Sequence, residues 1–219
     1  MEKILLIGAS DHCKYTIDII EQSGKYQIAG ILDRKLNKGS TFEGYPVLGY
    51  LEYLSEAQVS GIKAGIVAIG DNFTRWKVVD EILQMHPDFQ FCKAIHPSVI
   101  VGKNTVIGSG CVIMAGVILN NDCYIGDHCF IATKASLDHD SRLGSFSSLS
   151  PGVTTGGRVY IGERTAIGIG ANILHYIEIG SNVVIGGGSL VNKKIEDDVL
   201  SYGVPAKPVR KRTANEKYL

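Results

Sequence analysis

The chain has 219 residues, and its 22 lysines and arginines balance 22 aspartates and glutamates, so the formal net charge is zero. This length allows one large domain or two small ones. Without a net charge there is no field that attracts nucleic acid or an anionic membrane, and neither is expected as a partner. Five cysteines without C-x-x-C spacing favour reduced thiols in a cytoplasmic protein.

The first 90 residues alternate short apolar runs with helical patterns. The apolar run at residues 4–7 is too short for a signal peptide or a membrane span. Strands are expected at 3–8, 27–33 and 64–70, and helices at 11–23 and 73–85. Continuous apolar strands separated by helices predict a small parallel, Rossmann-like α/β sheet.

In such a sheet the ligand crevice lies at the carboxyl ends of the strands. Three polar segments collect there in this sequence: residues 8–12, Asp33 and residues 70–75. The sequence therefore predicts a binding site at that edge of the sheet.

From Ile95 to Val191 an aliphatic residue returns every six positions, and only Thr155 breaks the series. In a helix, residues six positions apart would point in all directions around the axis and could not form one apolar face. A solenoid with three flat faces buries them all, because each six-residue unit supplies one short strand and one corner. Glycine often follows the aliphatic residue, which we expect to allow the turn. Residues 1–90 are thus expected to form an α/β domain, and residues 91–219 a solenoid with a C-terminal tail.

A coil of eighteen residues places Asn121, His139, Gly157 and His175 in one column, with neighbours about 4.8 Å apart. Gly157 beside His139 is expected to leave a gap and to bare a backbone amide. An imidazole that removes a proton and an N–H that stabilises an oxyanion are what acyl transfer requires. Asp140 can hold the histidine in the right tautomer. The alternative is a solvated histidine in a charged turn.

Several motifs carry a family resemblance over nearly the full length. They are G-A-S-D-H-C-K at 8–14, I-L-D at 31–33, I-G-D-N-F-T-R at 69–75, A-I-H-P at 94–97, His139 with Asp140, L-S-P-G at 149–152, T-G-G at 155–157 and G-V-P-A-K-P-V-R at 203–210. The chain resembles the bacterial hexapeptide-repeat nucleotide-sugar acetyltransferases. These include UDP-4-amino-sugar and perosamine N-acetyltransferases and the sialic acid O-acetyltransferases.

The resemblance implies a left-handed parallel β-helix that assembles as a homotrimer, although general crossover rules favour the opposite hand. It implies that His139 is the general base, that Asp140 supports it, and that the Gly157 amide faces the thioester carbonyl. Acetyl-CoA, as co-substrate, is implied to lie between adjacent solenoids. The residues expected near it are Gly152, Gly157, Gly170, Ala206 and Lys207.

The same resemblance implies that the N-terminal sheet holds a nucleotide-sugar. The residues expected to bind it are Gly8, Ser10, His12, Asp33, Arg34 and Asn72. The chain departs from the family pattern at Asp11 and Cys13, where small residues are usual, and at Ser148, where some members carry a second histidine. Arg34 replaces a second acid and is expected to reach a phosphate or a different base.

A metal site is not expected, because His139 and His175 lie two coils, about 9.6 Å, apart. The expected function is transfer of an acetyl group from acetyl-CoA to the amine of a nucleotide-linked sugar, for surface glycan or polysaccharide biosynthesis. One alternative is O-acetylation of a sugar such as a sialic acid. A second alternative is a non-catalytic solenoid scaffold.

Overall fold

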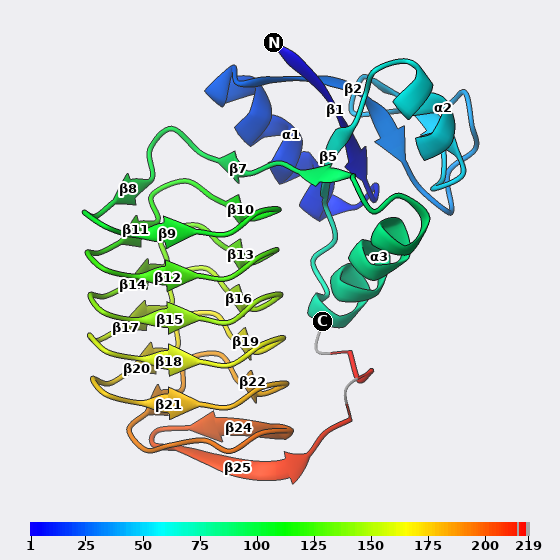
Figure 1. Ribbon diagram of the computed structural model, residues 1–219. Helices are drawn as coiled ribbons and strands as arrows, with labels where there is room; N and C mark the ends of the chain where they lie inside the picture. Colours follow the sequence, from blue (N-terminus) through cyan, green and yellow to red (C-terminus); the bar gives the residue numbers. More distant parts are fainter. Residues whose placement is uncertain (214, 218–219) are drawn as a thin grey trace.

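The computed structural model describes residues 1–213 and 215–217, which form an α/β sheet set beside the top of a long three-sided prism (Figure 1). The elements of the sheet half are β1 (Glu2–Ile7), α1 (Asp11–Ser23), β2 (Tyr26–Leu32), β3 (Thr41–Phe42), β4 (Tyr45–Gly49), α2 (Tyr53–Val59), β5 (Ala64–Val67), α3 (Asn72–Met85) and β6 (Gln90–Phe91).

The sheet has the strand order β3-β4-β2-β1-β5-β6, and all neighbours except the β3–β4 hairpin are parallel. Alternate side chains of the central strand β1 face opposite layers of helices. Ile4 and Leu6 pack with α1, whereas Leu5 and Ile7 pack with α2 and α3. The expected parallel α/β sheet is confirmed. Residues 34–63, for which the sequence predicts no element, contain β3, β4 and α2.

The prism consists of three sheets of short parallel strands. Face 1 contains β7 (Ala94–Ile95), β10 (Val112–Ile113), β13 (Phe130–Ile131), β16 (Ser148–Leu149), β19 (Ala166–Ile167), β22 (Val184–Ile185), β24 (Val199–Gly203) and the antiparallel β25 (Ala206–Lys211). Face 2 contains β8 (Ile100–Val101), β11 (Ile118–Leu119), β14 (Ser136–Leu137), β17 (Thr154–Thr155), β20 (Asn172–Ile173) and β23 (Leu190–Val191). Face 3 contains β9 (Val106–Ile107), β12 (Tyr124–Ile125), β15 (Arg142–Leu143), β18 (Tyr160–Ile161) and β21 (Glu178–Ile179).

Strands of successive coils pair eighteen residues apart, as in Val112 with Phe130 and Tyr124 with Arg142, until the last coil, where Val184 pairs with Leu200. The recurring aliphatic residues fill the interior, and Leu119, Ile125 and Leu143 have no exposed surface. Thr155, which breaks the series, accepts a hydrogen bond through Oγ1 from the backbone N–H of Asp138 at 3.0 Å. The coils wind with a left hand (Figure 1), so the hexapeptide-repeat β-helix is confirmed.

The corner glycines have another role than the expected one. The residues that turn the chain have φ between 53° and 71°, and they recur every six positions from Asn104 to Gly188, three places after each interior aliphatic. The glycines directly after the aliphatics are needed because coils lie close together at the corners. A Cβ on Gly102, for instance, would lie 2.5 Å from the backbone nitrogen of Asn121. These glycines provide close approach rather than the turn.

Helix α3 attaches the sheet to the prism through two buried polar side chains. Arg75 donates hydrogen bonds to the carbonyl oxygens of His128 (2.8 Å) and Phe146 (3.0 Å), which belong to successive coils. The side chain of Asn72 accepts from Arg75 (2.6 Å) and donates to the Thr165 carbonyl on a third coil (3.2 Å). These bonds fix the sheet along the corner between faces 3 and 1.

We expect Arg75→Met to lower the free energy of unfolding by about 3 kcal/mol, since it leaves several buried carbonyls without a charged donor. Lys77→Met on the exposed side of the same helix is the matched control. Chemical denaturation followed by circular dichroism measures both. Equal stability of the two variants would contradict a docking role for Arg75.

Candidate active site

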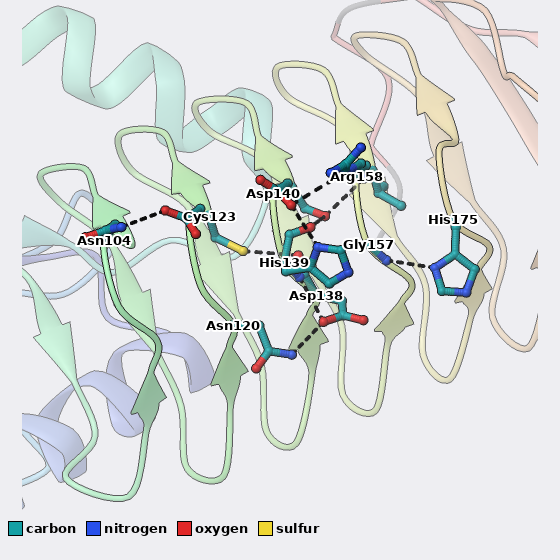
Figure 2. Close-up of polar contacts among 12 residues, drawn as sticks. Asn104, Asn120, Cys123, Asp138, His139, Asp140, Gly157, Arg158 and His175 are labelled. Carbon is teal, nitrogen blue, oxygen red and sulfur yellow. Dashed lines mark hydrogen bonds and ion pairs between the residues drawn. The ribbon is translucent and has the colours of Figure 1, made fainter.

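His139 lies in the corner between faces 2 and 3, next to the residue that turns the chain. Asp140 makes that turn with φ of 57°, and its Oδ2 lies 2.8 Å from Nδ1 of His139. Figure 2 shows the two side chains pointing toward each other, with Arg158 of the next coil approaching the same carboxylate (Nε to Oδ2 3.6 Å). The hydrogen bond from His139, together with the Arg158 charge, holds the pKa of Asp140 below its ordinary value. In the neutral tautomer that donates Nδ1–H to Asp140, the lone pair lies on Nε2.

Gly157 lies one coil further on, and its missing side chain makes room for the imidazole. A Cβ at this position would stand 2.5 Å from Nε2 and 2.6 Å from Cε1 of His139. The ring of His139 therefore lies against the Gly157 backbone, as the eighteen-residue spacing predicts.

The amide of Gly157 is not bare, which corrects the expectation from sequence. Its N–H donates to Nδ1 of His175, on the following coil, at 3.1 Å (Figure 2). The same contact recurs at other corners, where the N–H of Lys103 donates to Asn121 and that of Ser181 to Asp197. A corner side chain thus commonly accepts from the amide one coil earlier, and His175 follows this rule. His139 departs from it by pairing with Asp140.

A cavity of about 1010 Å³ lies between the sheet half and face 1 of the prism. The loop before α1, the loop before α3 and the outer residues of face 1 line it. Its lining includes Ser10, His12, Tyr15, Phe130, Ser148 and Pro151. The cavity therefore opens at the carboxyl ends of β1 and β5, where the sequence predicts a binding site.

His12 is buried at the wall of this cavity. Its ring meets that of Phe130 edge to face, with the centroids 4.1 Å apart. Burial, aided by the Arg75 charge, lowers the pKa of His12 to about 3, so the imidazole is neutral. Its Nε2 finds no hydrogen-bond partner among residues 1–213 and 215–217.

The other residues expected to bind a nucleotide-sugar take different positions. Gly8 has φ of 103°, a value suited to glycine, and a Cβ there would lie 2.8 Å from the Ile69 side chain. Asp33 accepts from the N–H of Ala9 through Oδ2 (2.8 Å) and from that of Lys35 through Oδ1 (2.7 Å). Its carboxylate thus shapes the loops at the cavity rather than pointing freely into it.

Two residues expected to contact the ligand, Arg34 and Asn72, instead make contacts within the protein. The guanidinium of Arg34 stacks over the ring of Tyr50, 5.0 Å from its centroid. Asn72 is buried in the joint between α3 and the prism and has no surface to offer a ligand. The sequence predicts Asn72 at the crevice but does not show that the prism lies over it.

The departures from the family pattern have distinct places. Asp11 lies at the cavity and pairs with Lys14 at 3.0 Å. Cys13 belongs to the buried face of α1, and burial raises the pKa of its thiol to about 12. Ser148 lies on the cavity wall.

The residues expected near acetyl-CoA divide between three places. Gly152 and Gly170 stack at the corner between faces 1 and 2, where a Cβ on either would meet open space. Gly157 lies at the next corner. Ala206 is buried in β25, whereas Lys207 beside it is exposed. The cavity reaches Pro151 and Ile169, next to the two stacked glycines, and face 2 separates it from His139.

Sequence reasoning missed several residues of the cavity. Tyr15, Lys35 and Phe130 line it, as does Lys217 near the end of the chain. Phe130 occupies an outward position of face 1, where the period-six pattern sets no requirement. No sequence pattern around Lys217 predicts that it lines the cavity, because the path of the C-terminal tail does not follow from the residues near it.

Neither a metal cluster nor a membrane span is found among residues 1–213 and 215–217. No group of three or more His, Cys, Asp or Glu side chains is placed to hold an ion. Within the same residues, every helix is too short or too polar to cross a bilayer.

Comparison with known proteins gives the same architecture. Residues 3–82 match the PglD N-terminal domain, and residues 104–139 and 158–193 match the bacterial transferase hexapeptide repeats. PerB from Caulobacter crescentus, solved with CoA and GDP-perosamine, is 35% identical with a TM-score of 0.89, over 96% of this chain and 98% of that chain.

Two further relatives are similar. The acetyltransferase domain of PglB from Neisseria gonorrhoeae FA1090, solved with acetyl coenzyme A, is 30% identical with a TM-score of 0.86, over 95% of this chain and 99% of that one. UDP-N-acetylbacillosamine N-acetyltransferase from Bacillus subtilis (strain 168) is 34% identical over 122 residues, 52% of each protein. The chain spans about half or less of the length of the curated relatives it matches.

We expect Gly157→Ala to push the His139 ring away from the corner while the coils stay in place. All three atoms nearest to the added Cβ belong to that ring, which can rotate, and Gly157 is not among the residues with positive φ. A crystal structure of the variant, with its melting temperature, tests this. An unmoved imidazole, or a collapsed coil, would refute the packing role.

Removal of the His139 ring should raise the pKa of Asp140, because the hydrogen bond from His139 is the largest cause of its low value. Carboxyl ¹³C NMR titration of His139→Ala measures this. Arg158→Ala removes a lesser cause and should raise the Asp140 pKa by a smaller amount. The opposite order of the two variants would show that the arginine dominates.

Proposed function

The chain belongs to the hexapeptide-repeat nucleotide-sugar acetyltransferases, and we propose that it transfers the acetyl group of acetyl-CoA to the amine of a nucleotide-linked sugar. The observation that carries the proposal is the His139–Asp140 pair, with its free Nε2, against the side-chain-free Gly157. The product would feed a surface glycan or polysaccharide.

In the proposed reaction Nε2 of His139 accepts a proton from the sugar amine as its nitrogen attacks the thioester carbonyl carbon. Asp140 keeps the other ring nitrogen protonated and stabilises the imidazolium that forms. The tetrahedral intermediate then collapses, the bond to sulfur breaks, and the histidine returns the proton to the thiolate of CoA. No acyl-enzyme is needed, since the amine attacks directly.

The Gly157 N–H is the donor we assign to the oxyanion of that intermediate. It already makes a hydrogen bond to His175, so it must exchange this acceptor for the thioester oxygen or share itself between the two. The His175 ring is exposed and has room to turn aside.

We assign the cavity to the nucleotide-sugar. Residues 1–90 supply its loops, including Gly8, Ser10, His12 and Asp33, and the prism supplies face 1. Gly152 and Gly170, with open space above them, are assigned to CoA, as are Gly157 and the tail at Ala206 and Lys207.

We further propose that the enzyme works as a homotrimer. Face 2 separates His139 from the cavity of its own chain, so a neighbouring chain must bring a cavity to it. Exposed apolar side chains on and beside faces 2 and 3, among them Ile118, Tyr124 and Tyr160, support such contacts.

The imidazole would serve an alcohol as well as an amine, so O-acetylation is the second candidate. It is favoured by Ser148, which leaves the cavity wall without the second histidine of some relatives. Turnover of nucleotide-linked 4-amino-sugars and of free sialic acid, each with acetyl-CoA and followed by thiol release, separates the two. Preference for the free sialic acid would replace the proposal by the alternative.

With the best acceptor, His139→Ala is expected to lower the rate by about 10²–10⁴. His96→Ala is the matched control, because His96 is bonded to Ser98 and Gln22, outside the cavity and the His139 corner. Stopped-time assays together with size-exclusion chromatography measure activity and assembly. Full turnover in an assembled His139→Ala protein would mean that the chain uses another base or is a scaffold.

A further inference from the structure

The last described residues form a strap that returns from the prism to the sheet half. The strap comprises residues 210–213 and 215–217, and it runs from the end of β25 toward α3 (Figure 1). It lies far in sequence from the loops that line the cavity, yet one of its side chains, Lys217, is part of the cavity lining.

Specific contacts hold the strap in this position. The guanidinium of Arg212 is buried and donates to both the carbonyl oxygen and Oδ1 of Asn182, each at 3.1 Å, and also to the carbonyl oxygen of Glu216. Arg210 forms an ion pair with the Glu216 carboxylate. Two arginines thus fix the backbone immediately before Lys217.

The charged side chains of the cavity lining indicate what kind of ligand group Lys217 is placed to contact. Its lining contains two carboxylates. Asp11 pairs with Lys14, and Oδ1 of Asp71 accepts from the N–H and hydroxyl of Thr74, whereas Oδ2 of Asp71 is buried and has no hydrogen-bond partner among the described residues. The lysines of the lining are Lys35 and Lys217. Neither takes part in an ion pair with another described residue.

The N-terminus of α1, which has no side-chain cap, faces the same cavity through Ser10 and His12, whereas the N-terminus of α3 is capped by the Asp71 carboxylate. Helix N-termini favour anions. Two ammonium groups and one uncapped helix N-terminus around one cavity are suited to the diphosphate of a nucleotide-linked sugar.

We propose that Lys217, held by the strap, is a substrate-positioning residue that contacts the diphosphate of the acceptor. The proposal rests on the proposed function, because that function assigns the cavity to a nucleotide-linked sugar. It adds that the C-terminal strap, and not the sheet loops alone, sets the affinity for the nucleotide part. Acetyl-CoA binding is independent of Lys217 in this scheme.

The direct test is calorimetric titration of UDP and of GDP into the wild-type protein and three variants. Lys217→Ala should weaken binding of the preferred nucleotide about 10-fold, the loss expected for one charge-assisted contact. Lys217→Arg should keep most of the affinity. Lys25→Ala, at an exposed lysine outside both the strap and the cavity lining, makes the same change in net charge and should bind like the wild type.

A strap variant gives an independent measurement. Arg210→Ala removes the ion pair to Glu216 without touching the cavity lining, and it should weaken nucleotide binding in the same direction. In steady-state kinetics Lys217→Ala should raise the KM for the acceptor and leave the KM for acetyl-CoA unchanged.

Failure of this inference is distinguishable from failure of the proposed function. If acetyl transfer proceeds but Lys217→Ala binds UDP and GDP as the wild type does, the role of Lys217 is wrong and the function stands. Absence of binding of either nucleotide to the wild type also overturns it. If binding depends on Lys217 but no acceptor is acetylated, the proposed function fails and the anion contact remains.

Discussion

The spacing between coils is the constraint from which the candidate chemistry follows. Backbone hydrogen bonds hold each strand directly over the strand eighteen residues away, so every corner side chain meets the corner of the next coil. At most corners this crowding is relieved by a small residue or by a side chain that accepts from a neighbouring amide. His139 fits only because Gly157 has no Cβ.

A second requirement is the rigid attachment of the sheet half. The cavity does not belong to either half alone, since loops of the sheet form one wall and face 1 forms the other. Asn72 and Arg75 connect α3 to three coils, and His12 packs against Phe130 of the prism. Catalysis by positioning demands precise geometry, because a misplacement of about 1 Å can lower the rate about 10²-fold. Buried hydrogen bonds across the joint are a physical means of meeting that demand.

Sequence reasoning recovered the parts of the fold that depend on local periodicity. The six-residue rhythm predicted the prism and its interior, and the eighteen-residue arithmetic put His139 over Gly157. It erred on the glycines after each aliphatic residue, because a pattern does not distinguish a turn from a close approach. The positive φ falls instead on residues as different as Asp140 and Phe146, which share only their place in the coil.

What the sequence could not predict depends on contacts between distant segments. Asn72 looked like a crevice residue because it follows β5, yet the prism covers it. The engagement of the Gly157 amide by His175 required knowledge of which way an exposed ring turns. The position of Lys217 required the path of the tail across the molecule. Periodicity fixes neighbours within the repeat, whereas these contacts are set by how two independent folding patterns pack together.

The separation of His139 from the cavity of its own chain has a consequence for the proposed enzyme. In the proposed enzyme each chain would carry both the base, His139, and the acceptor cavity, but on different sides of the prism. A reaction that needs both therefore depends on assembly of the chains. The contact between two chains then sets the distance from the base of one to the cavity of the other. In this arrangement the joint at Arg75 acts twice: it shapes the cavity within one chain, and it orients that cavity toward the His139 of another. Loss of this joint would then lower the rate without altering either the base or the residues that touch the substrate.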